Sequence, residues 1–355
     1  MFPHTFEPSD VTVLLDPITP EYLTAEERAQ RIASGVHYNE LISREAEPDA
    51  FYFDLFREQA VRLAEPMAVL FDTLADLVIA DCESRGVSPV LVSLVRAGTP
   101  TGVVLKRTLA CKGFEAPHYT VSIVQGKGFD VAAIKHILAD GHVAEQLIFV
   151  DGWTGKGVVR RELSQALKQL EPACGKFNDA LFVLSDIAGV AEFAATREDV
   201  LIPSALLSGP VSGLISRTIY RGEDEQVFHG AAVLDYLSPF DLSRWFVEVM
   251  MEAVRLLHSK PRAVPRIIKP EKKAVHDMVV FMTMLAYRTG ISDPVRVKPG
   301  VGEASRLFLR KKPTSLIVKS LENPDVAHLL ALAEKNSVPV VVWDDITIEA
   351  CAIMP

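Results

Sequence analysis

The chain has 355 residues with a formal net charge of −9, and 49% of its residues are hydrophobic. A chain of this length exceeds the size at which a single core stops growing, so we expect two domains. The acidic balance argues against nucleic-acid binding over the whole surface. No apolar run approaches the roughly 20 residues that cross a bilayer, and residues 1–10 lack the pattern of a secretory signal, so we expect a cytoplasmic protein without a membrane partner.

The first quarter of the chain is predicted to be mainly helical after an irregular start. Thr24 followed by Glu27 forms a capping-box pattern, which places the start of a helix at the segment 25–34. A longer helical pattern covers 51–84 and is broken at Pro66, because proline lacks the N–H that a helix interior needs.

From residue 89 onward, short apolar runs alternate with helical patterns. This alternation predicts a parallel sheet with helices on both faces, that is, an α/β fold. The strands are expected at 89–95, 118–124, 147–151 and 181–185, and the helices at 101–111, 130–139 and 157–170.

The segment 147–159, LIFVDGWTGKGVV, is an apolar strand that ends on Asp151 and continues into a glycine-rich turn and a helix. In an open α/β sheet, ligands gather where strand ends meet helix N-termini. Glycines let the backbone approach an anion, and a hydroxyl, a lysine and free N–H groups can bind its oxygens. The spacing fits neither a Walker A loop nor a dinucleotide fingerprint, and a turn without a ligand is the alternative to a phosphate site. The predicted phosphate site consists of Gly152, Thr154, Gly155, Lys156 and Gly157.

A second strand, turn and helix lies upstream, in the segment 89–110. Its turn holds Arg96, Ala97 and Gly98, and the next helix opens close behind them. Because both turns follow strands of one sheet, they suggest a ligand with two phosphate groups.

The two turns together resemble those of the type I phosphoribosyltransferases. The resemblance implies that family's parallel-sheet fold with a hood, and a reaction of phosphoribosyl pyrophosphate with Mg²⁺. Asp151 then faces the ribose and the metal, Thr154 to Gly157 hold the 5-phosphate, and Arg96 to Gly98 hold the pyrophosphate. Lys127 is implied as the cation of a mobile loop that closes over the reactants, so the implied catalytic residues are Asp151, Arg96 and Lys127. The family pattern has two successive acidic residues, and Gly152 stands at the second position.

More narrowly, the chain resembles the phosphoribosyltransferases of bacterial tellurite-resistance and stress operons. Some members of that group carry the label cysteine protease StiP. The stretches that carry the resemblance are SGVHYNELISREAEP, DGWTGKG and IPSALLSGPVSGLISRTIY, spread over about the first 250 residues.

The protease label invites a search for a catalytic cysteine. The four cysteines show no CxxC pairing and no metal-ligand spacing. None is predicted at a strand-to-helix turn or a helix N-terminus, where a thiolate would be stabilised. The cysteines are Cys82, Cys111, Cys174 and Cys351.

The segment 201–222 is rich in Ser, Gly and Pro, and a plain loop would explain that composition. By resemblance to the hood of type I enzymes, Ser212 and Arg217 are implied on the acceptor side of the pocket. Asp186, at the end of the strand predicted at 181–185, is expected at the same edge.

The second domain is expected to follow a basic, proline-rich linker. Ser238 and Pro239 predict the start of a helix that runs to about Leu257. Three prolines and many cations in 259–273 then predict an extended linker. The boundary therefore separates a domain at residues 1–258 from one at 274–355.

The C-terminal part is predicted to be a small α/β unit. A helix over 274–289 is followed by a strand over 294–297 and by a turn that leads into a helix. A further strand, helix and strand are expected at 314–320, 325–336 and 338–343.

The turn and helix after residue 298 resemble the RNA-binding domains of the L7Ae and Pelota class. Their GxNExxK signature corresponds here to Gly300, Gly302, Glu303 and Arg306, with Lys298 just before it. Between residues 260 and 320 there are 14 Lys or Arg against 4 acidic residues, the local reversal of charge that an RNA site needs. A solvated basic surface is the alternative.

Taken together, the resemblances imply a magnesium-dependent phosphoribosyltransferase that modifies a base-like or related acceptor and is coupled to a domain that binds structured RNA. The resemblance places it in a bacterial stress or tellurite-resistance system, and the sequence leaves open whether it forms a homo-oligomer. A non-catalytic sensor of phosphoribosyl pyrophosphate that regulates through RNA, or a cysteine peptidase, are the alternatives.

Overall fold

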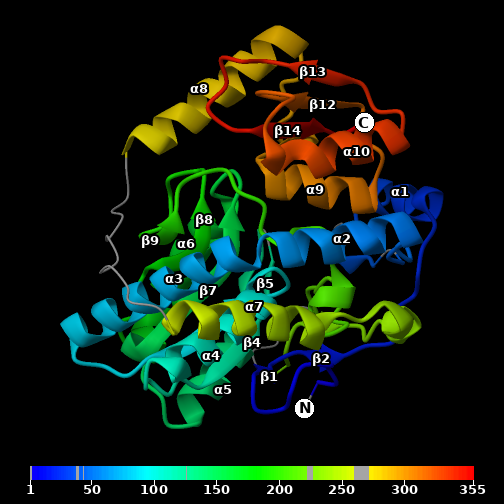
Figure 1. The fold of residues 1–355 in the computed structure, drawn as a ribbon. Helices are drawn as coiled ribbons and strands as arrows, with labels where there is room; N and C mark the ends of the chain where they lie inside the picture. The colour runs from blue at the N-terminus through cyan, green and yellow to red at the C-terminus, as the bar shows by residue number, and fades with distance from the viewer. Residues whose placement is uncertain (1, 37–39, 43, 125, 222–226, 260–271) are drawn as a thin grey trace.

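The computed structural model describes residues 2–36, 40–42, 44–124, 126–221, 227–259 and 272–355. The larger domain is built on a six-stranded sheet in the order β1-β4-β3-β7-β8-β9, and every neighbouring pair is parallel (Figure 1). The predicted α/β class is therefore confirmed. The strands are β1 (Thr12–Val13), β3 (Val90–Leu94), β4 (His118–Val121), β7 (Leu147–Thr154), β8 (Leu181–Asp186) and β9 (Phe193–Thr196).

Helices cover both faces of this sheet. Because successive side chains of a strand point to opposite faces, each strand contributes to the cores on both sides. Ile148 packs into the core shared with α3, α4 and α7, whereas its neighbour Phe149 packs into the core shared with α5 and α6. The strands are therefore apolar at nearly every position, as buried parallel strands are. The helices are α3 (Ala64–Arg85), α4 (Gly98–Cys111), α5 (Val131–Ala139), α6 (Val158–Cys174) and α7 (Ser243–His258).

Two further helices come before α3 in the sequence. The helix α1 (Ala25–Ala33) has the predicted capping box, in which the Glu27 N–H donates to the Thr24 hydroxyl. The helix α2 (Ala50–Arg62) meets α3 at Leu63, so the predicted break at Pro66 is wrong by three residues. Pro66 lies in the first turn of α3, where the N–H that proline lacks would have no partner within the helix.

Two other boundaries differ from prediction. Ser238 and Pro239 lie in the 3₁₀ helix η5 (Asp235–Phe240) instead of starting α7. The helix starts at Ser243, whose N–H and hydroxyl both donate to Asp241, at 3.0 and 2.7 Å. The strand predicted over 118–124 is divided into β4 and β5.

Several short elements complete the larger domain. Among them, the hairpin of β5 and β6 is antiparallel, and β2 pairs in parallel with β10. These elements are β2 (Asp16–Pro17), β5 (Ile123–Val124), β6 (Gly128–Phe129), η2 (Ala144–Gln146), η3 (Pro203–Ala205), η4 (Gly209–Val211) and β10 (Gly230–Ala231).

The C-terminal part forms a four-stranded mixed sheet in the order β11-β14-β12-β13. Ile317 faces a core with α8, while its neighbour Leu316 shares a core with α9 and α10. The central strand β14 was not predicted, and the strand expected at 294–297 begins only at Val297. The elements are α8 (Lys272–Thr289), η6 (Pro294–Arg296), β11 (Val297–Pro299), α9 (Val301–Arg310), β12 (Ser315–Val318), η7 (Pro324–Val326), α10 (Ala327–Lys335), β13 (Val340–Val342) and β14 (Ala350–Ile353).

The predicted linker falls almost wholly on residues 260–271, which lie outside the described residues, so the proposed domain boundary stays a prediction. Among the described residues, no helix combines the length and the apolar character needed to cross a bilayer.

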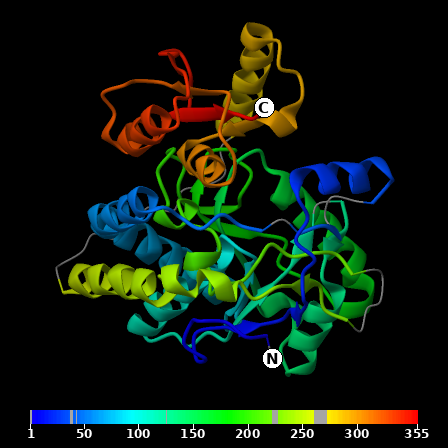
Figure 2. The same ribbon diagram turned by 90° about the vertical axis from the view of Figure 1, so that its right-hand side faces the viewer.

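The small domain docks with α9 against the end of the large domain where β7, β8 and β9 finish (Figures 1 and 2). Asp199, which follows β9, accepts hydrogen bonds from the N–H groups of Val301 and Glu349, both at 2.8 Å. The residue at the N-cap of α9 is Gly300, which has no side chain to cap the helix. Asp199 therefore caps α9 from the other domain and joins the two.

Replacing Asp199 by alanine should loosen this docking. The change leaves the N–H groups of Val301 and Glu349 without their acceptor, at a cost of roughly 2 kcal/mol. Hydrogen exchange should accelerate by about tenfold or more at the start of α9 and near Glu349. Asp293→Ala is the matched control, because Asp293 caps a turn within the small domain by accepting from Val295. Equal exchange rates in Asp199→Ala and the unchanged protein would contradict the capping role.

Candidate active site

The parallel register of β3 and β7 brings the two predicted phosphate turns together. Ser93 lies opposite Val150, so Arg96 and Asp151 follow neighbouring strands at the same edge of the sheet. A Cβ atom on Gly98 would lie only 2.6 Å from the Val150 carbonyl oxygen. The turn after β3 therefore packs directly on the end of β7, as a joint ligand site requires.

Arg96 is buried and is held by two segments far away in the sequence. Its guanidinium forms an ion pair with Glu45 and donates to the Ile215 carbonyl at 3.3 Å. Glu45 also accepts from the Gly209 N–H at 3.2 Å. Burial alone would raise the pKa of Glu45, but the charges of Arg96 and Arg310 outweigh it and hold that pKa below its ordinary value. Glu45 therefore stays ionised and ties Arg96 to the segment predicted as the hood.

Asp151 lies at this edge beside the domain interface. Its carboxylate accepts from the Gly152 N–H at 2.7 Å. Burial raises the pKa of Asp151 from 3.8 to about 7, although the Gly152 hydrogen bond and the charge of Arg306 act in the opposite direction. Near neutral pH this carboxyl group is therefore divided between its charged and neutral forms.

In the predicted 5-phosphate turn, some backbone N–H groups have no partner among the described residues, whereas the lysine side chain is already bonded to the small domain. Gly157 has a φ of +72° and forms the N-cap of α6. The N–H groups of Lys156 and Gly157 donate to no residue that the structure describes. The Lys156 ammonium donates to the carbonyls of Pro294 and Val297 in the small domain, the latter at 3.0 Å. Burial, followed by the charge of Lys298, lowers the pKa of Lys156.

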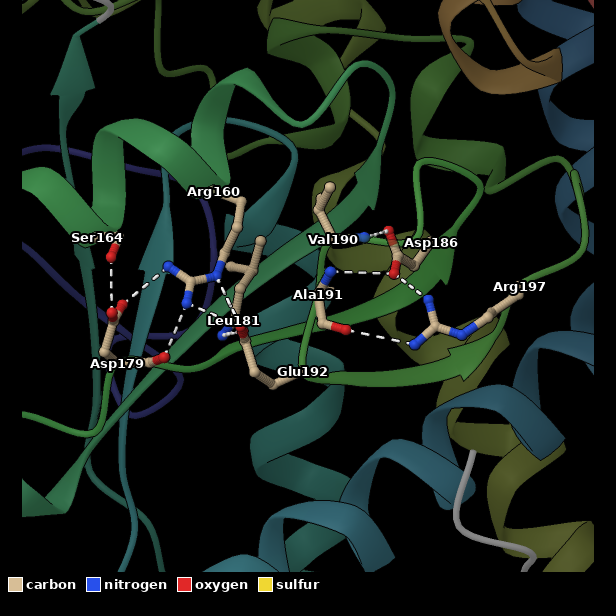
Figure 3. Close-up of polar contacts among 9 residues, drawn as sticks. All are labelled: Arg160, Ser164, Asp179, Leu181, Asp186, Val190, Ala191, Glu192 and Arg197. Carbon is tan, nitrogen blue, oxygen red and sulfur yellow. Dashed lines mark hydrogen bonds and ion pairs between the residues drawn. The ribbon is translucent and has the colours of Figure 1, made fainter. Parts of the chain in front are cut away.

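The Asp186 carboxylate, at the end of β8, binds several groups of the surrounding loops (Figure 3). Its buried carboxylate pairs with Arg197 and accepts from the Thr154 hydroxyl at 2.5 Å. It also accepts from the N–H groups of Val190 and Ala191, at 3.1 and 3.0 Å. Both oxygens are thus occupied, which argues against the predicted contact with an acceptor and leaves Thr154 with its hydroxyl proton committed to Asp186.

A second network in Figure 3 fixes α6 against the strands beside it. Arg160 pairs with Asp179 and Glu192, both at 2.8 Å, and Glu192 also accepts from the Leu181 N–H at 3.0 Å. Ser164 donates to Asp179 at 2.6 Å. These bonds set the position of α6, and therefore of the turn at its N-terminus.

The remaining predicted residues of the transferase site lie farther around the edge. Ser212 is buried just after η4, and its N–H donates to the Gly209 carbonyl at 3.0 Å. Arg217 follows it in the segment that contacts Arg96 through Ile215. Lys127 is exposed on the β5–β6 hairpin, with its ammonium 4.7 Å from the centroid of the Tyr220 ring. No described contact joins Lys127 to Arg96 or Asp151.

Three of the residues predicted to recognise RNA, Gly302, Glu303 and Arg306, face the phosphate turn, whereas Gly300 lies against Ile187 and Asp199. The Trp153 indole N–H donates to Glu303 at 3.1 Å, and a Cβ on Gly155 would lie 3.3 Å from the Glu303 Cγ. A Cβ on Gly302 would lie 3.5 Å from the Trp153 ring. The Arg306 guanidinium lies 6.0 Å from the centroid of the same ring. The two sites that the sequence suggested separately therefore meet at one interface.

Sequence reasoning missed four residues of this arrangement. Trp153 lies inside the quoted DGWTGKG motif, and Arg310 lies one helical turn after Arg306, so both could have been found from spacing. Glu45 and Asp199 carry no local signal, because their partners are far away in the sequence.

A cavity of about 410 Å³ also lies between the domains, beside Asp199. Acidic side chains dominate its lining, which makes it unsuited to phosphate groups. Its acidic lining residues are Glu198, Asp199, Asp277, Asp325 and Glu349.

The cysteines show no activated thiolate among the described residues. Cys82 is buried, and burial raises its pKa to about 11. Burial also raises the pKa of Cys351. Cys111 is exposed but is the last residue of α4, away from the helix N-terminus that would stabilise a thiolate. In the described part of the chain, no group of three or more His, Cys, Asp or Glu side chains could hold a metal ion.

Two parts of the chain match the models of known protein families. Residues 4–251 match the family model described as the tellurite-like stress resistance cysteine protease StiP. Residues 277–355 match the PELOTA RNA binding domain. The curated cysteine protease StiP of Acinetobacter baylyi is 34% identical over 357 residues, covering 97% of this chain and 91% of that protein.

Two similar solved structures are of hypoxanthine phosphoribosyltransferase from Trypanosoma cruzi. One, at 1.4 Å resolution, has a TM-score of 0.30 and 14% identity, and the match covers 39% of this chain and 82% of that chain. The other, in complex with the product IMP, has a TM-score of 0.30 and 14% identity, with coverages of 39% and 76%.

Alanine substitutions at two glycines test the contact between the turns. Gly98→Ala should lower the free energy of unfolding by roughly 1–3 kcal/mol, because its methyl group collides with the Val150 carbonyl. Gly152→Ala is the matched control, since a Cβ there would meet its nearest neighbours at 3.5 Å, an ordinary contact. Urea denaturation of both variants measures the difference. Equal stability of the two variants would show that the turns are not packed as described.

The raised pKa of Asp151 predicts a pH dependence of stability. Between pH 3.8 and about 7, the folded state holds a proton that the unfolded state has lost. The free energy of unfolding should therefore fall as pH rises through this range, by up to about 1.4 kcal/mol per pH unit from this group. Asp151→Asn should remove that slope.

Asp199 supplies the comparison for this experiment. Burial raises its pKa to about 6, so Asp199→Asn should remove only the part of the slope below that pH. Urea denaturation measured from pH 4 to 8 distinguishes the two variants. An unchanged slope in Asp151→Asn would mean that Asp151 is as well hydrated in the folded protein as in the unfolded chain.

Proposed function

The chain belongs to the tellurite-like stress resistance family StiP, and we propose that its larger domain is a phosphoribosyltransferase that uses phosphoribosyl pyrophosphate with Mg²⁺. The observation that carries the proposal is the direct contact between the turn after β3 and the end of β7, at the carboxyl edge of a parallel sheet. Adjacent turns at this edge suit a sugar with a phosphate group at each end.

The donor would bind through groups that the structure leaves available. The 5-phosphate would receive the N–H groups of Lys156 and Gly157 at the N-terminus of α6. The pyrophosphate would lie at the turn of Arg96 to Gly98, where α4 begins. Asp151 would lie between the two and accept from the ribose hydroxyls.

The reaction needs no covalent enzyme intermediate. The bond between C1 of the ribose and the pyrophosphate oxygen breaks, and the electron pair leaves with the pyrophosphate. An acceptor nucleophile then forms a new bond to C1, which has carbocation character. Arg96 stabilises the departing charge, and Asp151 holds the ribose in place, so positioning and electrostatics supply the catalysis.

The side chains of this site suit a metal ion only when it arrives with the donor. Asp151 is the one carboxylate at the predicted ribose position, and a Mg²⁺ ion commonly takes most of its ligands from substrate phosphates and water. Asp151 and the donor's oxygens would therefore hold the ion, which would neutralise the phosphate charge.

We further propose that the C-terminal domain binds structured RNA. Support comes from its match to the PELOTA RNA binding domain and from the excess of Lys and Arg around it. In the docked arrangement, Glu303 and Arg306 contact the larger domain through Trp153. RNA contact by these residues would therefore require the domains to separate.

Two alternatives have an observation in their favour. Gly152 at the second acidic position, and Glu303 against Gly155, favour a protein that binds the donor without turning it over. The family description names a cysteine protease, but neither buried cysteine has the lowered pKa that a nucleophilic thiolate needs.

Release of pyrophosphate from phosphoribosyl pyrophosphate, measured with Mg²⁺ and a panel of bases, nucleosides and RNA, tests the proposal. Asp151→Asn should weaken donor binding roughly tenfold to a hundredfold, because it removes the carboxylate that accepts from the ribose hydroxyls. Lys156→Ala should weaken it less, because its ammonium is bonded to the Pro294 and Val297 carbonyls and supports the donor only as a positive charge beside the turn. Lys168→Ala is the control, since Lys168 is exposed on α6 away from its N-terminus.

The outcomes separate the three functions. Binding of the donor without pyrophosphate release would replace the transferase by a sensor. Absence of donor binding would end the proposal altogether. Peptide hydrolysis that is lost in one of the four single Cys→Ser variants would establish the peptidase instead.

A further inference from the structure

Two arginines of the small domain lie on one face of α9 at the interface with the larger domain. Arg306 and Arg310 are four residues apart, so their side chains emerge on the same side of the helix. The charge of Arg306, together with burial and the charge of Arg96, holds the pKa of Arg310 well below its ordinary value. The Arg306 guanidinium lies 6.0 Å from the centroid of the Trp153 ring, and a Cβ on the neighbouring Gly152 would lie 3.5 Å from the carbonyl oxygen of Ala97, which follows Arg96. Arg96 and the two arginines of α9 therefore gather around the end of β7.

The carboxylates nearby offset only part of this charge. Arg96 is paired with Glu45, and Arg306 lies 3.9 Å from Glu303. Arg310 forms no hydrogen bond or ion pair with any residue that the structure describes, and only the more distant charges of Glu45 and Glu303 act in its favour. Three cations beside two carboxylates leave an excess of positive charge, which favours the binding of an anion with more than one charge.

The shape of the arginine side chains favours phosphate groups over other anions. A guanidinium presents a planar fork of donors that matches the oxygens of a phosphate group. Arg96 belongs to the turn packed on the end of β7, and Arg306 and Arg310 belong to α9, which docks on the same end of the sheet. Two linked phosphate groups can contact both sides at once, whereas a single phosphate satisfies fewer of the donors.

We infer that Arg96, Arg306 and Arg310 form one composite site for a diphosphate group, to which the C-terminal domain supplies two of the three cations. The inference rests on the proposed function for the identity of the natural ligand, which would be the pyrophosphate of the donor. It follows that the site is complete only when α9 is docked on the larger domain.

Binding of inorganic pyrophosphate to the full-length protein, measured by calorimetry, tests the inference without requiring turnover. Arg306→Ala and Arg310→Ala should each weaken binding about tenfold to a hundredfold. Lys312→Ala is the matched control, because Lys312 is an exposed cation two residues beyond Arg310, and its change should be under about twofold. Inorganic phosphate should bind more weakly than pyrophosphate and respond less to Arg310→Ala.

Arg310→Ala removes no hydrogen bond or ion pair among the described residues and relieves repulsion from Arg306 and Arg96, so it should not lower the urea midpoint, and weaker binding cannot come from unfolding. Failure of the unchanged protein to bind pyrophosphate, or equal binding by Arg306→Ala, Arg310→Ala and the unchanged protein, would overturn the composite site.

The same variants separate this inference from the proposed function. If pyrophosphate binding is weakened by Arg306→Ala and Arg310→Ala but the unchanged protein does not turn over phosphoribosyl pyrophosphate, the composite site stands and the transferase proposal is wrong. Unaltered turnover and donor affinity in Arg306→Ala and Arg310→Ala would keep the transferase and end the composite site.

Discussion

The candidate site depends on the parallel pairing of β3 with β7. This pairing places the turn at Arg96 and the turn after Asp151 at one edge, and the small Gly98 lets them touch. A slip of one residue would turn every side chain of β7 to the opposite face and expose its apolar core positions to the wrong helix layer. Because Ile148 and Phe149 fill two different cores, the packing of particular side chains on both faces fixes the register, and the register brings the two turns together.

Docking of the small domain is the second constraint. Asp199 caps α9 across the interface, and Trp153 donates to Glu303. The residues that match the RNA signature therefore cover the turn proposed for the 5-phosphate. The proposed RNA contact and the proposed transferase site would use one surface, so the two proposed functions would be coupled through the docking equilibrium.

Local patterns predicted much of this structure, and contacts between distant segments account for the rest. Alternating apolar runs predicted the parallel sheet, and the Thr24–Glu27 spacing predicted the cap of α1, because both signals lie within a few residues. The roles of Glu45 and Asp199 depend on partners over 50 and 100 residues away, for which no local spacing exists. Strand β14 has only four residues, too few for a clear strand pattern in the sequence. It is defined by its pairing with β11 on one side and β12 on the other.

Hydrogen exchange with and without phosphoribosyl pyrophosphate and Mg²⁺ tests the central claim most directly. If the two turns hold one ligand, the donor should slow exchange at Arg96 to Thr99 and at Lys156 to Val158 together, with the same dependence on its concentration. Protection of only one turn, or of neither while the donor is bound elsewhere, would contradict the joint site.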